Sequence, residues 1–200
     1  MAGLIGVFGG TFDPPHYGHL VLAEAGREAL GLERVLWVVT AQPPHKPNEP
    51  RTPVEVRLEM VSAAIRGNPA FEISRADVDR PPPHYAVGTL RHLSALQPEA
   101  RWVYLMGEDS LRDLPSWHAP REFLEACESI GVMERSGAEP NLEDLEQVLP
   151  GLSARVRFFH APIIDLASHD LRSRVQAGQS IRYLVPEGVE RIIRGQGLYR

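Results

Sequence analysis

The feature that most constrains the fold lies in the first 31 residues, where a strand, a glycine turn and a helix follow one another. Leu4 to Phe8 is an apolar run of the length of a buried strand, and Gly9-Gly10 follows it as a tight turn would. From Gly18 the apolar residues take helical spacing, and this pattern stops at Gly31. A buried strand that leads directly into a helix is the usual opening of a βαβ unit.

Strand-like and helix-like segments alternate along the rest of the chain. Further strands are expected at residues 35–39, 71–74, 102–106, 129–133 and 156–159. Helices are expected from Pro53 to about Ile65 with Thr52 as N-cap and Glu55 as third helical residue, around residues 90–93, over 141–146, and after Val185 up to Gly195. This alternation predicts a single doubly wound, Rossmann-like α/β domain over residues 1–200, with a mainly parallel sheet.

Composition excludes several classes of function. The formal net charge of −5 and the pI near 5.9 argue against a broad nucleic-acid surface. Cys127 is the only cysteine, so neither an internal disulfide nor a cysteine metal cluster is expected. The first apolar run has no basic flank and is too short for a signal peptide or a membrane span. We therefore expect a cytoplasmic protein with no membrane or nucleic-acid partner.

The segment from Gly9 to His19, GGTFDPPHYGH, lies where the first strand passes to the first helix. Ligands bind at such carboxyl ends of parallel strands, and glycines there let backbone N–H groups approach a phosphate. His16 and His19 are three residues apart at the start of the helix, so both rings can face one anion. Either histidine alone is as well explained as an ordinary polar residue, but the joint pattern predicts a phosphate site.

This pattern resembles the first signature of the HxGH nucleotidyltransferase superfamily. Further blocks, in the same order, are similar to those of the bacterial nicotinate-nucleotide adenylyltransferases. They are PPHK at 43–46, GED at 107–109, LPSWH at 114–118 and SIRYLVP at 180–186. The resemblance therefore extends over nearly the whole chain.

Two blocks depart from the family pattern. Where the family usually reads SYTxxTL, residues 84–90 read HYAVGTL, so Ala86 lacks a hydroxyl and Gly88 lacks a polar side chain. Where the family usually reads ISSTxIR, residues 166–172 read LASHDLR, which keeps Ser168 and Arg172. The first change bears on recognition of the acceptor, and the second bears on how the triphosphate is held.

The resemblance implies a role for each matching residue. His16 and His19 would contact the α- and β-phosphates of ATP, and Lys46 would add a positive charge on the triphosphate. The nucleotide site would comprise Gly9, Gly10, Thr11, Phe12, Gly18, Gly107, Asp109, Ser168 and Arg172. The acceptor site would comprise Tyr85, Thr89, Trp117 and Arg135. Taken alone, Lys46 also fits a solvated loop, Asp109 a helix cap, Trp117 the core and Arg172 the surface.

The activity implied is adenylyl transfer from ATP to nicotinate mononucleotide, which gives nicotinate adenine dinucleotide and pyrophosphate in NAD biosynthesis. Magnesium is expected to be bound mainly through ATP phosphates and water, with no metal site built by the protein. Nicotinamide mononucleotide or phosphopantetheine as acceptor remains an alternative, and so does a nucleotide-binding module without turnover. The sequence leaves the oligomeric state open, a homo-oligomer included.

Overall fold

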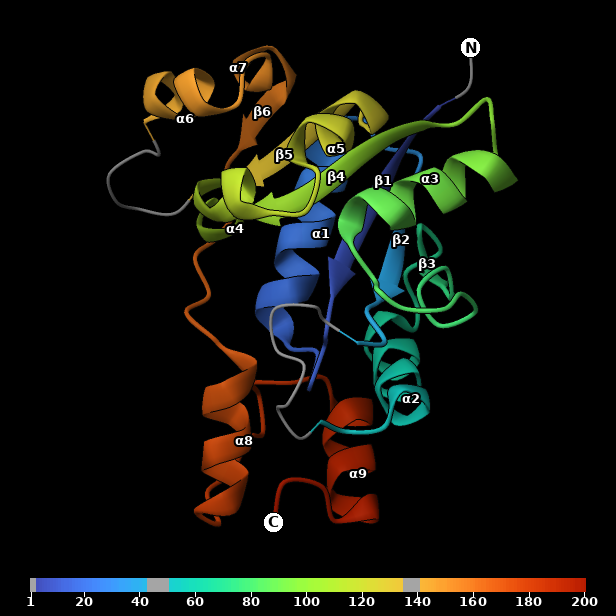
Figure 1. Ribbon diagram of the computed structural model, residues 1–200. Coiled ribbons are helices and arrows are strands. Elements are labelled where there is room, and N and C mark those ends of the chain that lie inside the picture. Colours follow the sequence, from blue (N-terminus) through green and yellow to red (C-terminus); the bar gives the residue numbers. More distant parts are fainter. Residues whose placement is uncertain (1–2, 43–50, 135–140) are drawn as a thin grey trace.

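The computed structural model describes residues 3–42, 51–134 and 141–200 and has a parallel sheet at its centre (Figure 1). The six strands are β1 (Leu4–Gly10), β2 (Arg34–Val39), β3 (Phe71–Ser74), β4 (Arg101–Gly107), β5 (Ser129–Met133) and β6 (Val156–Phe159). They lie in the order β3-β2-β1-β4-β5-β6, and every pairing is parallel. This confirms the predicted doubly wound α/β fold, whose strand order reverses between β1 and β4.

Helices join the strands and continue beyond the last one. They are α1 (Tyr17–Ala29), α2 (Val54–Ile65), α3 (Ala86–Leu96), α4 (Glu108–Asp113), the 3₁₀ turn η1 (Leu114–Ser116), α5 (Pro120–Ala126), α6 (Leu142–Val148), α7 (Leu152–Arg155), α8 (Ser168–Gln176) and α9 (Glu187–Gln196). None of the helices in the described parts of the chain is long and apolar enough to span a membrane.

Alternate residues of the strands form two cores, one on each face of the sheet. On one face, Val7 and Tyr104 lie in a buried cluster with Leu90 of α3 and Phe123 of α5. The other face has Phe8, Trp37 and Leu105 in a cluster with residues of α1 and α2. Side chains of a strand alternate between faces, so the helices on both faces cover the apolar residues of the central strands.

The C-terminal helices form a third apolar cluster beyond the sheet. Leu171 of α8 and Val189 and Ile193 of α9 are buried there with Met60 of α2. In Figure 1, α8 and α9 lie below the sheet and the C-terminus ends near them. This arrangement brings the end of the chain close to the segment that follows β1.

Several predicted boundaries differ from the observed ones, and three of these differences involve glycine or proline. The first strand does not stop at Phe8, because Gly9 and Gly10 continue the pairing opposite Val38 and Val39. Helix α2 begins at Val54 with Pro53 as its N-cap, one residue later than predicted, and no side chain caps it.

The third wrong boundary is the end of the last helix. Helix α9 runs through Gly195 to Gln196. Gly197 ends it, because that glycine takes the left-handed conformation, with φ +63°, in which a helix commonly stops.

Candidate active site

One cavity of about 470 Å³ opens at the carboxyl ends of β1 and β4. One side is lined by the motif after β1, including Gly10, Thr11 and His19, and the other by Tyr85 and Trp117. This is the switch point of the sheet, where doubly wound folds bind their ligands. Its volume lies within the range of small-molecule sites.

His16 and His19 lie together at the start of α1. Their rings are stacked with centroids 3.7 Å apart and planes inclined by 29°. His19 lines the cavity and lies edge-on to Phe12, whereas His16 is 5% exposed and lies against His19. The structure therefore brings the two predicted histidines to one place, with His19 at the cavity wall.

The hydrogen bonds of this pair determine which ring nitrogen of His19 can donate. The backbone N–H of His16 donates to Nδ1 of His19 over 3.2 Å, so Nδ1 carries no proton and Nε2 does. Burial lowers the pKa of His16 to about 4, and burial together with His16 lowers that of His19 well below its usual range. Both imidazoles are therefore neutral at pH 7, and His19 presents an N–H donor.

The backbone and the His16 ring approach Gly18 closely, so a side chain at this position would crowd both. A Cβ at this position would lie 3.1 Å from Nδ1 of His16 and 3.4 Å from the carbonyl oxygen of Ile164. Nδ1 of His16 is itself buried and has no hydrogen-bond partner among residues 3–42, 51–134 and 141–200. A buried polar atom without a partner is costly, and such atoms are found at functional sites.

A buried arginine holds the loops that carry this motif. Arg57 of α2 is 1% exposed and donates to four backbone carbonyl oxygens. The acceptors are Thr52, Thr11, Thr40 and Ala41, at 2.8–3.0 Å. These carbonyls lie after β1, after β2 and before α2. One guanidinium thus fixes three loop ends beside the cavity.

Asp13 is a second point where distant segments meet. Its buried carboxylate accepts a hydrogen bond from the Thr52 N–H at 3.2 Å and another from the hydroxyl of Tyr199. Arg172 of α8 donates to the carbonyl oxygen of Asp13 at 2.8 Å, and Ser168 donates to that of Pro14 at 2.9 Å. Both α8 residues predicted for the nucleotide site therefore contact the motif itself.

The side of the cavity that Tyr85 and Trp117 line is aromatic. Tyr85 stacks on His118, with centroids 4.1 Å apart. Trp117 is half-buried, lines the cavity and meets Tyr104 and Phe123 edge-on. Trp117 therefore packs against the core and also lines the cavity, so both expectations for this residue hold in part.

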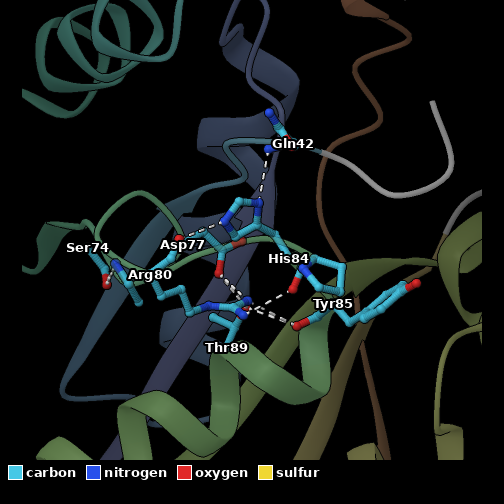
Figure 2. Close-up of polar contacts among 9 residues, drawn as sticks. Gln42, Ser74, Asp77, Arg80, His84, Tyr85 and Thr89 are labelled. Carbon is cyan, nitrogen blue, oxygen red and sulfur yellow. Dashed lines mark hydrogen bonds and ion pairs between the residues drawn. The ribbon is translucent and has the colours of Figure 1, made fainter. Parts of the chain in front are cut away.

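A buried polar network lies beneath Tyr85 (Figure 2). Asp77 accepts hydrogen bonds from Nη2 of Arg80 at 2.9 Å and from the Thr89 hydroxyl at 2.6 Å. His84 accepts the Gln42 N–H on Nδ1, so its Nε2 is protonated and donates to the carbonyl oxygen of Arg80. The hydroxyl proton of Thr89 is used within this network.

Of the predicted site residues, Lys46 and Arg135 lie outside the described residues. Asp109 is exposed, lines the cavity and pairs with Arg112 at 3.1 Å. The cavity wall also includes the remaining predicted positions of the described chain, Gly9, Gly10, Phe12 and Gly107. Of the predicted site residues in the described ranges, His16, Gly18, Ser168 and Arg172 do not line this cavity.

Sequence reasoning missed Asp13, Arg57, Asp77, Arg80 and Tyr199. Asp13 lies inside the motif, and Asp77 and Arg80 have opposite charges and are three residues apart, as in many ion pairs. The sequence therefore contained a signal for these three residues. Arg57 and Tyr199 gave no such signal, because their partners lie up to 186 residues away along the chain.

The fold and the paired histidines at its switch point define a Rossmann-like nucleotidyltransferase. The chain matches a cytidylyltransferase-like family model over residues 7–174. It is 47% identical to a probable nicotinate-nucleotide adenylyltransferase of Thermomicrobium roseum over 196 residues, 98% of this chain and 91% of that protein. A protein of the same name from Salinibacter ruber is 41% identical over 98% of this chain and 97% of its own length. The chain therefore belongs to the cytidylyltransferase-like family and, within it, to the nicotinate-nucleotide adenylyltransferases.

A solved structure has the same fold at much lower sequence identity. The nicotinic acid mononucleotide adenylyltransferase of Plasmodium falciparum, complexed with NaAD, superposes with a TM-score of 0.76 and 18% identity. The match covers 98% of this chain and 97% of that one. At this identity the likeness concerns the fold alone.

Proposed function

We propose that this chain transfers the adenylyl group of ATP to nicotinate mononucleotide, forming nicotinate adenine dinucleotide and releasing pyrophosphate as a step of NAD biosynthesis. The observation that carries the proposal is the single cavity joining the HxGH segment to the wall of Tyr85 and Trp117. One side suits a polyphosphate and the other a flat ring, so two nucleotides can meet within it. The names of the relatives supply the identity of the acceptor.

The reaction is an in-line displacement at the α-phosphorus. A phosphate oxygen of the acceptor forms the new bond to phosphorus while the bond to the bridging oxygen breaks, and pyrophosphate leaves with that electron pair. The attacking oxygen is already anionic, so positioning and charge stabilisation are the main requirements. No side chain needs to be adenylylated.

His19 and His16 are assigned to the phosphates. His19 lines the cavity, and its Nε2–H is a neutral donor. His16 is assigned to the charge that develops in the transition state on the family resemblance and on its stacking against His19. Lys46 is assigned to the triphosphate on the family resemblance.

The other nucleotide residues are assigned by their position. Gly9, Gly10, Thr11 and Phe12 form the floor beside the phosphates, and Gly18 lets the His16 ring approach the backbone. Gly107 and Asp109, at the end of β4, are assigned to the nucleoside. Ser168 and Arg172 hold the motif through its backbone, and Arg172 keeps further N–H groups for phosphate.

The acceptor ring is assigned to Trp117, and its carboxylate to the first turn of α3. The first N–H groups of a helix lack intrahelical partners, and Tyr85 provides no side-chain cap for them. Tyr85, Ala86 and Thr89 line the cavity there. Because these donors belong to the backbone, the missing hydroxyl at Ala86 leaves them in place. Arg135 is assigned to the acceptor phosphate on its position after β5.

Magnesium would be held by phosphate oxygens and water rather than by a protein cage. No group of three or more His, Cys, Asp or Glu side chains suited to a metal ion occurs within the described ranges. The ion would supply neutralisation of the triphosphate charge. The cytoplasmic location and the absence of a nucleic-acid partner stay predictions.

The test is an acceptor panel with ATP and Mg²⁺, followed by pyrophosphate release and product mass. Nicotinate mononucleotide should exceed nicotinamide mononucleotide in kcat/KM by at least about tenfold, or ~1.4 kcal/mol, because charge-assisted hydrogen bonds are stronger than neutral ones. Phosphopantetheine should not react. Incubation with ATP and Mg²⁺ alone should leave the protein mass unchanged. Release of pyrophosphate with no pyridine nucleotide acceptor reacting would overturn the proposal.

A further inference from the structure

The described wall of the cavity carries two aspartates, Asp77 and Asp109, and no lysine or arginine. This is an unfavourable composition for a site that receives anions. Each aspartate pairs with the arginine three residues later, Arg80 or Arg112. The Asp109 pair is exposed and therefore screened by water, whereas Asp77 has a side chain only 3% exposed and depends on its partner.

The negative charge of Asp77 acts on a residue that lines the cavity. Burial raises the pKa of Tyr104, a wall residue of β4, and the Asp77 carboxylate raises it further. The same carboxylate accepts the Thr89 hydroxyl in the first turn of α3. Its negative charge thus lies beside the backbone donors assigned to the acceptor's carboxylate.

Arg80 joins Asp77 to that first turn. Figure 2 shows its guanidinium between Asp77 and the start of α3. It donates to the Asp77 carboxylate and the Thr89 hydroxyl, and also to the carbonyl oxygens of Pro83 and Tyr85. Its side chain is 15% exposed. The arginine therefore neutralises Asp77 and fixes the backbone where α3 begins.

Gly88 makes room for this arginine. A Cβ at position 88 would lie 3.0 Å from Nη1 of Arg80. A larger side chain would push the guanidinium away from the helix start. The absence of a side chain at Gly88, one of the departures from the family pattern, thus has a physical reason in the position of Arg80.

We propose that Arg80 is a specificity-determining positioning residue: by neutralising Asp77 in the wall, it allows the first turn of α3 to accept an acidic rather than a neutral acceptor ring. The inference rests on the proposed function. Without the guanidinium, the buried carboxylate of Asp77 would face the acceptor's carboxylate at short range and in a poorly screened environment. A neutral carboxamide would be much less affected.

A purely structural role and this charge role predict different effects of the Asp77 and Arg80 variants on the choice of acceptor. If the network only supported the fold, Asp77→Asn and Arg80→Met would change the use of both acceptors in the same direction. The charge role predicts opposite effects on the ratio of kcat/KM for nicotinate over nicotinamide mononucleotide. Arg80→Met should lower this ratio about tenfold, mainly through KM of the acid, and Asp77→Asn should keep or raise it.

The experiment measures this ratio in the wild type, both single variants, the double variant and Arg80→Lys. The double variant has a neutral wall and should return to within about threefold of the wild-type ratio, and Arg80→Lys should keep most of it. Arg75→Met is the matched control, since Arg75 is an exposed arginine of the same segment, paired with Glu55 and Asp79, and should leave the ratio unchanged. Circular dichroism and thermal unfolding establish that each variant is folded.

If Arg80→Met does not fold, Asp77→Asn, Arg80→Lys and the double variant decide the question. An unchanged ratio in a folded Arg80→Met, or a fall of the ratio in Asp77→Asn, would overturn the inference while leaving the proposed function intact. A wild type that uses neither mononucleotide would overturn the proposed function, and the inference with it.

Discussion

Replacing His16 by asparagine should remove a specific part of the pH dependence of folding stability. Burial lowers the pKa of His16 in the folded protein to about 4, against 6.5 for a free imidazole. Because the folded pKa is the lower one, the unfolded chain binds the proton first as the pH falls. The stability due to the neutral, buried ring is therefore complete above pH 6.5 and is lost between pH 6.5 and about 4.

The size of this effect follows from the shift. Each unit of pKa difference corresponds to ~1.4 kcal/mol, so His16 should reduce the free energy of unfolding by about 2 kcal/mol between pH 7 and pH 5. His19 adds to the loss in the same direction, because its pKa is also lowered by burial. The His16→Asn variant loses the contribution of His16 and retains the part of the His19 contribution that is due to burial.

The assay is urea unfolding followed by circular dichroism at pH 7, 6, 5.5 and 5. The quantity of interest is the difference between wild type and variant at each pH, because carboxylates that titrate in both proteins cancel from it. That difference should shrink by about 2 kcal/mol from pH 7 to pH 5. A constant difference for His16→Asn would refute the buried, neutral state of this ring.

Four further substitutions test the site and the contacts that support it. His16→Ala should lower kcat by a factor on the order of a hundred with little effect on ATP affinity, whereas His19→Ala should also weaken ATP binding about tenfold by calorimetry; the reverse division would reassign the roles. Trp117→Ala should lower kcat/KM about tenfold for both pyridine mononucleotides and leave ATP affinity within about twofold, because stacking does not depend on the acid group; an unaffected variant would make this ring purely a core residue. Tyr199→Phe removes the hydroxyl bound to Asp13 and should lower the free energy of unfolding by about 1 kcal/mol, and an unchanged urea midpoint would contradict that bond.

The sheet could be predicted from the sequence because each strand is a short apolar run between turn residues. Strands β3, β5 and β6 have the predicted bounds. The error at β1 has a clear cause: Gly9 and Gly10 look like a turn locally, but they pair with Val38 and Val39 across the sheet. Strand pairing is a tertiary interaction, and glycine alone does not reveal it.

The end of the last helix, α9, also could not be predicted from local sequence. Two glycines, Gly195 and Gly197, could each end α9, and composition does not distinguish them. Gly197 has a positive φ and is the C-cap, whereas Gly195 lies within the helix. Which glycine ends a helix depends on the backbone path that follows, here the last turn toward Tyr199 and its bond to Asp13.

For the site, the sequence indicated several residues that line the cavity but not the arginines that hold the loops around it. His16 and His19 are close in sequence, so their proximity follows from helix geometry. Arg57 binds four backbone carbonyl oxygens, and Arg80 binds two besides the side chains of Asp77 and Thr89. Every residue has a carbonyl oxygen, so no sequence pattern identifies these partners. Only the folded chain brings those carbonyls to one guanidinium.

Two arginines held within the fold help to explain how a chain of net charge −5 can form a site for two anionic nucleotides. Arg57 is buried, the side chain of Arg80 is 15% exposed, and both hold loop ends beside the cavity by their carbonyl oxygens. Burying such charges is costly, and several hydrogen bonds and a nearby aspartate offset the cost. In the described wall, which has no lysine or arginine, the donors are neutral: backbone N–H groups, hydroxyl groups such as those of Thr11 and Thr40, and the ring of His19. Such donors are fixed by the fold before a ligand arrives, so little reorganisation is needed when charge develops at the α-phosphorus.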